Sequence, residues 1–348
     1  MKIDNIDLQN FMAFDALNTS FSPNINIIFG ENSTGKSALL KVMYAAMKSI
    51  ADIKNVKAEI TNEKVENIVI EKIAGVFMPE NDAVGRLVGR QQGSNRAEIK
   101  ISLNNHEQVS MGFGNRQTRH IDLAFNTEMK SDNFVPIFIP PKEIISSTSN
   151  FTSLYDDYHI AIDETYYDLA RLLMRPLKKG PNTAEQNSVL TEFAKIMNGS
   201  VFQKDNKFYL KVKGSGEFEM GLVSEGYRKL STLIYLILSG SLNKNAILFW
   251  DEPEANINPK YIPVLAELLI MLESEGVQIF VSTHDYFLSK YIEVKRSKES
   301  EVQYISLYKD DEEKVQCETA TEFELLEHNA IMDTFRQLYR EEIGVVLK

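Results

Sequence analysis

Cysteine is nearly absent from this 348-residue sequence, which has only Cys317. One cysteine excludes a disulfide within the chain and any zinc site built from paired C-x-x-C motifs of this chain. Long hydrophobic runs are also missing: no stretch of about 18 apolar residues occurs, and the N-terminus lacks the apolar core of a signal peptide. We therefore expect a cytoplasmic protein that has no membrane-spanning segment.

The sequence has no excess of basic residues, since 49 acidic residues outnumber 38 lysines and arginines and the net charge is −11. An acidic surface opposes nonspecific binding to nucleic acids. Two clusters of basic residues are explained most simply as solvent-exposed faces, although contact of these clusters with DNA stays an open alternative. These groups are Arg86, Arg90, Arg96 and Lys100, and Arg171, Arg175, Lys178 and Lys179.

The most specific pattern is the segment from Gly30 to Ser37, GENSTGKS, which fits G-x-x-x-x-G-K-[ST]. An apolar strand is predicted over 25–29, directly before it, and an amphipathic helix over 38–50. In such a loop, main-chain N–H groups surround phosphates, Lys36 reaches the outer phosphates and the Ser37 hydroxyl ligates magnesium. The sequence thus predicts ATP and Mg²⁺ as cofactors. The predicted ATP-binding residues are Gly30, Asn32, Ser33, Thr34, Gly35, Lys36, Ser37 and Ala38.

Two further apolar strands deliver polar residues at their carboxyl ends. The strand over 246–250 ends in Asp251-Glu252-Pro253, the form of a Walker B site, in which Asp251 and Ser37 hold magnesium and Glu252 polarises the attacking water. The strand over 277–282 leads to His284, which can orient that water. We predict Lys36, Glu252 and His284 as the catalytic residues. The alternatives are that Asp251-Glu252-Pro253 is an acidic strand end without a catalytic role, and that His284 is a structural histidine.

About 215 residues separate Lys36 from Asp251, so a large insertion is expected between them. Residues 222–230, LVSEGYRKL, place a serine and a glycine before an apolar helix, which resembles a degenerate signature motif of ABC-type ATPases. Residues 255–259, ANINP, resemble their D-loop, and His284 their switch histidine. The order of motifs resembles ABC ATPases of the SMC, RecF and OLD lineage, and more narrowly the stand-alone AAA_15/AAA_21 ATP-binding proteins found in bacterial anti-phage defence systems.

This resemblance implies an ATP site that two protomers complete together. Ser224 and Gly226 of one protomer would contact in trans the ATP held by the other, and Asn256 and Asn258 would belong to the D-loop. ATP would then hold a homodimer or a higher oligomer together, and hydrolysis would loosen it. An ordinary helix N-cap is a compatible interpretation of Ser224.

Three departures from the family pattern stand out. Residues 134–143 lack the glutamine that usually follows a strand there, and Gln91 and Gln92 lie in a predicted turn and are not assigned to that role. Glu225 replaces the first glycine of the signature motif. Residues 10–14 offer no basic side chain to meet the phosphates. We therefore expect slow turnover.

The predicted fold class is α/β: an ABC-type ATPase head with a mostly parallel central sheet, an antiparallel β subdomain and an inserted short helical arm. Residues 1–141 form the first part of the head in this prediction, 142–199 the arm, and 200–348 the second part. Helices are expected over 155–177, 183–197, 230–242, 259–274 and 322–342, and a hairpin over 201–213. Without a sustained heptad repeat, a long coiled coil is not expected.

Three functions remain open. The leading hypothesis is an ATP-hydrolysing switch that controls a separately encoded effector protein in anti-phage defence, because no second catalytic cluster is evident in the sequence. The second is a RecF- or SMC-like ATPase that clamps DNA in repair or maintenance. The third is an ATP-binding scaffold with negligible turnover.

Overall fold

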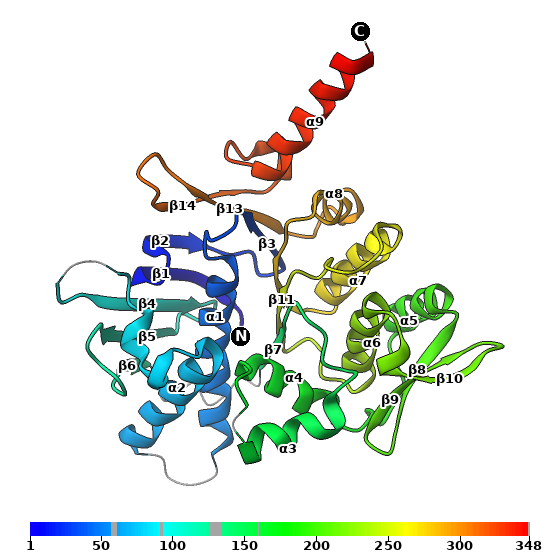
Figure 1. Cartoon of the computed structure of the whole chain (residues 1–348), viewed down its shortest axis with the longest axis horizontal. Helices are drawn as coiled ribbons and strands as arrows, with labels where there is room; N and C mark the ends of the chain where they lie inside the picture. The colour runs from blue at the N-terminus through cyan, green and yellow to red at the C-terminus, as the bar shows by residue number, and fades with distance from the viewer. Residues whose placement is uncertain (57–60, 91–92, 126–133, 159, 347–348) are drawn as a thin grey trace.

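The fold is a three-layer α/β arrangement with additional small sheets, described here from a computed structural model (Figure 1). The structure describes residues 1–56, 61–90, 93–125, 134–158 and 160–346. Gln91 and Gln92 lie outside these residues. No described helix is both long enough and apolar enough to cross a membrane.

The central sheet has six strands in the order β14-β13-β3-β12-β11-β7, and all neighbours are parallel except β13 and β14. Strands β3, β11 and β12 are buried along their whole length, as expected for parallel strands covered on both faces. This confirms the mostly parallel sheet. The bounds are β3 Ile25–Gly30, β7 Val135–Ile139, β11 Ala246–Asp251, β12 Gln278–Ser282, β13 Val302–Lys309 and β14 Val315–Ala320.

A five-stranded antiparallel sheet, β2-β1-β4-β5-β6, forms the predicted antiparallel subdomain. Its buried and exposed residues alternate, as in β4, because one face packs on the core and the other meets solvent. The strands are β1 Ile3–Phe11, β2 Phe14–Ser20, β4 Arg96–Leu103, β5 Gln108–Gly114 and β6 Asp122–Phe125. The third sheet, β10-β9-β8, contains the predicted hairpin, and its strands are β8 Gly199–Lys204, β9 Lys207–Val212 and β10 Gly216–Glu219.

Two hydrophobic clusters lie on opposite faces of the central sheet. In β11, Leu248 and Trp250 belong to one cluster and Ile247 and Phe249 to the other, as the alternation of a strand requires. The first cluster includes side chains of α4–α8, and the second includes α1, α2 and the antiparallel sheet. The α-helices are α1 Lys36–Asn55, α2 Asn62–Phe77, α3 Thr148–Tyr158, α4 Glu164–Leu173, α5 Ala184–Met197, α6 Glu225–Leu238, α7 Ile262–Ser274, α8 Tyr286–Lys295 and α9 Ala330–Val346.

Three predicted helices differ from the structure. The helix expected over 230–242 begins at Glu225 and ends at Leu238, because the chain turns at Ser239 and Gly240, where Gly240 has φ 73°. The helix expected over 155–177 is replaced by α3 and α4, because the Asp163 side chain caps a new helix by accepting the Thr165 N–H. The helix expected over 322–342 begins with a short 3₁₀ turn, Phe323–Leu325, and becomes α-helical only at Ala330. Helix α9 then extends away from the body and exposes Leu338 and Tyr339 (Figure 1).

Helices α4 and α5 of the segment 142–199 pack on the head. Leu169 and Leu173 of α4 and Phe193 of α5 are buried in the same cluster as the central sheet. The division at residues 141/142 and 199/200 stays a prediction.

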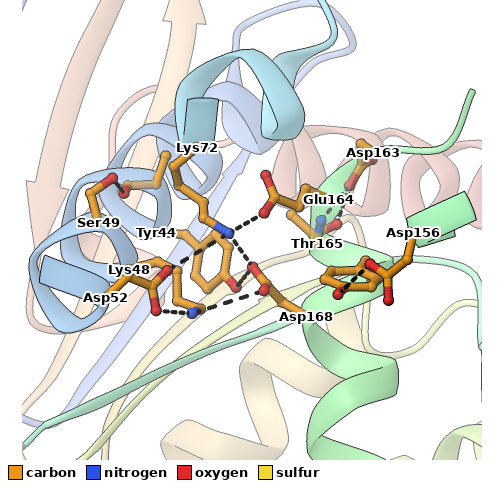
Figure 2. A network of polar contacts seen from close by, with 12 residues as sticks. Tyr44, Lys48, Ser49, Asp52, Lys72, Asp156, Asp163, Glu164, Thr165 and Asp168 are labelled. Atoms are coloured by element: carbon orange, nitrogen blue, oxygen red, sulfur yellow. Dashed lines mark hydrogen bonds and ion pairs between the residues drawn. The ribbon is translucent and has the colours of Figure 1, made fainter. Parts of the chain in front are cut away.

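Buried charges connect this segment to the helix that follows the glycine-rich loop (Figure 2). Lys72 of α2 lies 2.9 Å from Asp168 of α4 and also pairs with Glu164. The Tyr44 hydroxyl of α1 donates to Asp168 at 2.7 Å. Burial alone would lower the pKa of Lys72, but Asp168 and Glu164 outweigh it and raise that pKa. The network therefore joins α1, α2 and α4 around the charge of Lys72.

Candidate functional site

The loop of residues 30–37 lies between β3 and α1 and depends on two glycines. Gly30 has φ 151°, and a Cβ there would lie 2.0 Å from the main-chain oxygen of Leu307 in β13. Gly35 has φ 92° at the N-cap of α1, and a Cβ there would lie 2.6 Å from the ring of Phe14. Both positions therefore exclude any other residue, and the main chain keeps a tight turn at the start of a 20-residue helix.

Lys36 folds back over this loop. Its Nζ donates to the main-chain oxygens of Gly30 at 2.9 Å and Glu31 at 2.7 Å. Burial lowers the pKa of Lys36, while Asp251, Glu252 and Glu31 oppose that effect. Because the charges of Asp251 and Glu252 act on Lys36, the end of β11 lies near the loop. Of the other predicted ATP-binding residues, Asn32, Ser33 and Ser37 are exposed, Ala38 is half-buried and Thr34 is buried.

Asp251 is the last residue of β11 and is 3% exposed. The parallel register places it beside Ser282 of β12, whose hydroxyl donates to the Asp251 carboxylate. The next residue, Glu252, has φ 50°, and its N–H donates to the Ser282 main-chain oxygen at 3.0 Å. This left-handed turn directs the chain away from the sheet at the strand end, and the Glu252 side chain stays part-exposed.

His284 lies opposite Glu252 across the same edge of the sheet. Its Nε2 is 3.9 Å from Glu252 Oε1. Burial and the charge of Lys36 lower the pKa of His284, while Glu252 and Asp251 oppose the change. The ring is therefore neutral near pH 7 in this structure. The structure thus brings Lys36, Asp251, Glu252 and His284 to one place, as parallel strand ends should.

The signature segment, residues 222–230, lies elsewhere. Ser224 is the exposed N-cap residue of α6 and its side chain makes no capping hydrogen bond. Helix α6, which Ser224 begins, packs on the opposite face of the central sheet from α1, the helix that follows the glycine-rich loop (Figure 1). Gly226 contacts the predicted D-loop, because a Cβ there would lie 2.7 Å from the Asn256 main-chain oxygen. Asn258 caps the next turn by accepting the Lys260 N–H.

The side chains present fit a nucleotide with magnesium. Ser37 and Asp251 offer hydroxyl and carboxylate oxygens, the hard ligands that Mg²⁺ prefers. Gly30 leaves no room for a side chain at the turn, Lys36 is directed into the loop, and the start of α1 favours negative charge. Among the described residues, no cluster of three His, Cys, Asp or Glu side chains could hold another metal ion.

A protein-family model matches residues 25–290, about three quarters of the chain, and is described as "AAA domain, putative AbiEii toxin, Type IV TA system" (AAA_21). The chain belongs to the AAA_21 family. The matched range begins at β3 and ends within α8, so it includes both the glycine-rich loop and His284.

Curated relatives of this AAA_21 chain carry the name "DNA replication and repair protein RecF". The protein of Lacticaseibacillus casei (strain BL23) is 33% identical over 102 residues, 29% of this chain and 24% of the relative. That of Halalkalibacterium halodurans is 41% identical over 44 residues, 13% of this chain and 12% of the relative. The match thus spans about a quarter or less of these relatives.

Solved structures show the same fold. An SMC head bound to the C-winged helix domain of ScpA has a TM-score of 0.58 at 14% identity, covering 92% of this chain and 98% of that one. An SMC head with an extended coiled coil, bound to the C-terminal domain of ScpA derived from Pyrococcus furiosus, has 0.53 at 12% identity, covering 98% and 99%. The AAA_21 chain is a P-loop ATPase of the SMC and RecF lineage with an ABC-type head, as the sequence indicated.

Sequence reasoning missed several residues that contact the predicted site. Lys229 of α6 is 3% exposed, and its Nζ donates to the Glu252 main-chain oxygen at 3.1 Å. Glu254 accepts the His284 N–H at 3.0 Å. In the loop after β7, where a glutamine was expected, Glu143 instead accepts from Arg228 of α6 at 2.6 Å. A lysine on the buried face of an apolar helix was the available signal for Lys229.

Proposed function

We propose that this AAA_21 protein is a cytoplasmic ATP-hydrolysing switch that assembles through ATP sites shared between two copies. One observation carries the proposal: Lys36, Asp251, Glu252 and His284 meet at one edge of the sheet, whereas Ser224 is exposed at the start of a helix that packs on the opposite face of the sheet from α1. In this proposal, the glycine-rich loop with Glu252 and His284 forms one half of an ATP site, and Ser224 of a second copy supplies the other half.

The roles follow from position. Main-chain N–H groups of residues 32–37 and the Lys36 ammonium would bind the phosphates, and Ser37 and Asp251 would hold magnesium. Bound magnesium would neutralise charge on the phosphate oxygens. Glu252 would accept a proton from the attacking water, and the neutral His284 ring would orient that water or donate to the γ-phosphate. The exposed N-terminus of α6, with Ser224, would complete the site of a second copy.

Light scattering tests this switch. Glu252→Gln protein should show about a twofold rise in mass with Mg-ATP, because binding persists while hydrolysis falls on the order of 10-fold or more. Lys36→Ala should show no rise, since it lacks the cation that binds the phosphates. An unchanged mass of Glu252→Gln, or equal turnover with the parent, would favour the scaffold that binds ATP without hydrolysing it.

For the output, we propose control of a separately encoded effector in anti-phage defence. The described residues hold no group of three or more His, Cys, Asp or Glu side chains that could bind a metal ion, and we assign a destructive step to a partner. The family description names a putative toxin of a TA system, and such a system has two components. Co-purification of the protein with products of neighbouring genes, with and without Mg-ATP, tests this output.

A DNA-clamping ATPase is the second candidate, because the curated relatives are named for DNA replication and repair and the structural neighbours are SMC heads. The net charge of −11 weighs against a broad phosphate-binding surface. The two candidates separate in one assay: DNA-stimulated hydrolysis that weakens steeply between about 50 and 200 mM salt supports clamping, and hydrolysis indifferent to DNA supports the effector switch.

A further inference from the structure

A half-buried glutamate that the proposed reaction does not use, Glu254, lies three residues after Asp251. Glu254 follows the turn made by Glu252, where the Ala255 N–H donates to the Glu252 oxygen at 3.2 Å. Glu254 also lies directly before the predicted D-loop, and the Glu254 main-chain oxygen accepts the Ile257 N–H at 2.9 Å. Glu254 therefore lies between the catalytic pair and the segment that contacts Gly226 of α6.

One oxygen of Glu254 holds the His284 segment. Oε1 accepts the His284 main-chain N–H at 3.0 Å, and the next N–H, of Asp285, donates to the Thr283 hydroxyl at 2.9 Å. The only ion-pair partner that the described residues give the His284 ring is Glu252, at 3.9 Å. The main chain of His284, which carries the ring, is consequently held by Glu254.

The other oxygen of Glu254 makes no such bond. Oε2 is buried and has no hydrogen-bond partner among the described residues. Burial lowers the pKa of Lys229 in α6, and the carboxylate that opposes this most is Glu254. Within the part of the chain that the structure describes, the Lys229 ammonium donates to the Glu252 main-chain oxygen at 3.1 Å, and an ammonium has two further N–H donors. Lys229 thus touches the Walker B turn from the helix that begins at Ser224.

We propose that Glu254 is a positioning residue that holds His284 against Glu252, and that Lys229 links this arrangement to the start of the signature helix. The proposal rests on the proposed ATPase function. A shift of α6 when Ser224 meets the site of another copy would reach Glu252 through Lys229, and His284 through Glu254. Each site would thereby sense whether its own signature helix is engaged.

Three variants at two glutamates test the role of Glu254. Glu254→Ala should lower kcat about 10- to 100-fold with KM and ATP affinity changed less than about 2-fold, because the histidine is displaced and the phosphates are not. Glu254→Gln keeps an acceptor for the His284 N–H and should retain kcat within about 3-fold. Glu273→Gln is the matched control: Glu273 is also partly buried, but it accepts from Asn24 at 2.6 Å, away from the site.

Hydrogen exchange supplies a readout that needs no turnover. The His284 amide should exchange at least about 10-fold faster in Glu254→Ala and at the parent rate in Glu254→Gln and Glu273→Gln. Unchanged exchange in Glu254→Ala, or a loss of kcat matched by an equal loss of ATP affinity, would overturn the positioning role. If the parent protein hydrolyses no ATP, the proposed function fails, while the exchange rates still decide whether Glu254 holds His284.

Lys229→Met tests the link to α6, because methionine keeps the apolar stem and removes the charge. It should lower kcat on its own, and the double variant with Glu254→Ala should lose less than the product of the two single losses. Independent, multiplying losses would show that Lys229 does not act through the same arrangement.

Discussion

At the scale of single residues, glycines and left-handed main-chain conformations shape the predicted site at the ends of the strands. Gly30 and Gly35 shape the loop, and Glu252 and Asn256 have φ values of 50° and 63°. A non-glycine residue in this region costs energy that the surrounding structure must repay. These turns place Glu252 beside His284 and direct the chain toward Gly226.

The substitution Gly226→Ala would have two opposing effects on the free energy of unfolding. Glycine to alanine within a helix normally gains up to about 1 kcal/mol. At Gly226, however, the new methyl would lie 2.7 Å from the Asn256 main-chain oxygen, and such overpacking costs about 1–3 kcal/mol. We expect Gly226→Ala to lower the free energy of unfolding in urea and to reduce ATP hydrolysis on the order of 10-fold.

Gly221→Ala is the control for this substitution, because no atom lies within 4 Å of a Cβ at Gly221. Its stability and hydrolysis should match the parent protein. Equal behaviour of the two alanine variants would show that the contact between Gly226 and Asn256 does not set the position of the D-loop.

At the scale of elements, the buried strands next to motifs were predictable to within one residue. Runs such as Ile27-Ile28-Phe29 read as strands because both faces are covered, and the polar residues that end them are those of the site. The helix break before Asp163 was missed, since an aspartate cap looks like any polar residue in a helical pattern. Pairs such as Tyr44 with Asp168, 124 residues apart, leave no local signal in the sequence.

The charged network between α1, α2 and α4 gives a prediction at this scale (Figure 2). Lys72→Met would leave Asp168 and Glu164 buried without their main cation, and losing one partner of a buried pair costs about 3–5 kcal/mol. We expect a loss of that order in urea unfolding. Lys195→Met, which breaks the exposed pair with Glu192, should leave stability unchanged.

The sign of the pH dependence follows from the same contacts. Because the pKa of Lys72 is raised in the folded state, its contribution is complete below the pKa of an unfolded lysine, 10.5, and is lost only as pH rises through the folded value. The deficit of Lys72→Met should therefore be the same between pH 6 and 8. A deficit that disappears in this range would mean that Lys72 is not charged there.

At the scale of the whole molecule, the predicted site has two parts. The glycine-rich loop, Glu252 and His284 meet at one edge of the central sheet, whereas Ser224 is exposed at the start of α6. Leu222, two residues before Ser224, is 75% exposed, which is costly for a leucine that stays in water. A second copy seated on the signature segment would cover it.

Leu222→Glu tests this surface in the Glu252→Gln background. A buried, unpaired carboxylate at the interface should abolish the Mg-ATP-dependent rise in mass, while the affinity of the single chain for ATP stays within about 2-fold because the loop is untouched. The matched control is Val294→Glu near the C-terminal end of α8, an equally exposed apolar residue, at 74%, outside the signature segment. Association lost in the control as well, or retained with Leu222→Glu, would place the contact between copies away from the signature segment, and a site completed in trans by Ser224 would then be wrong.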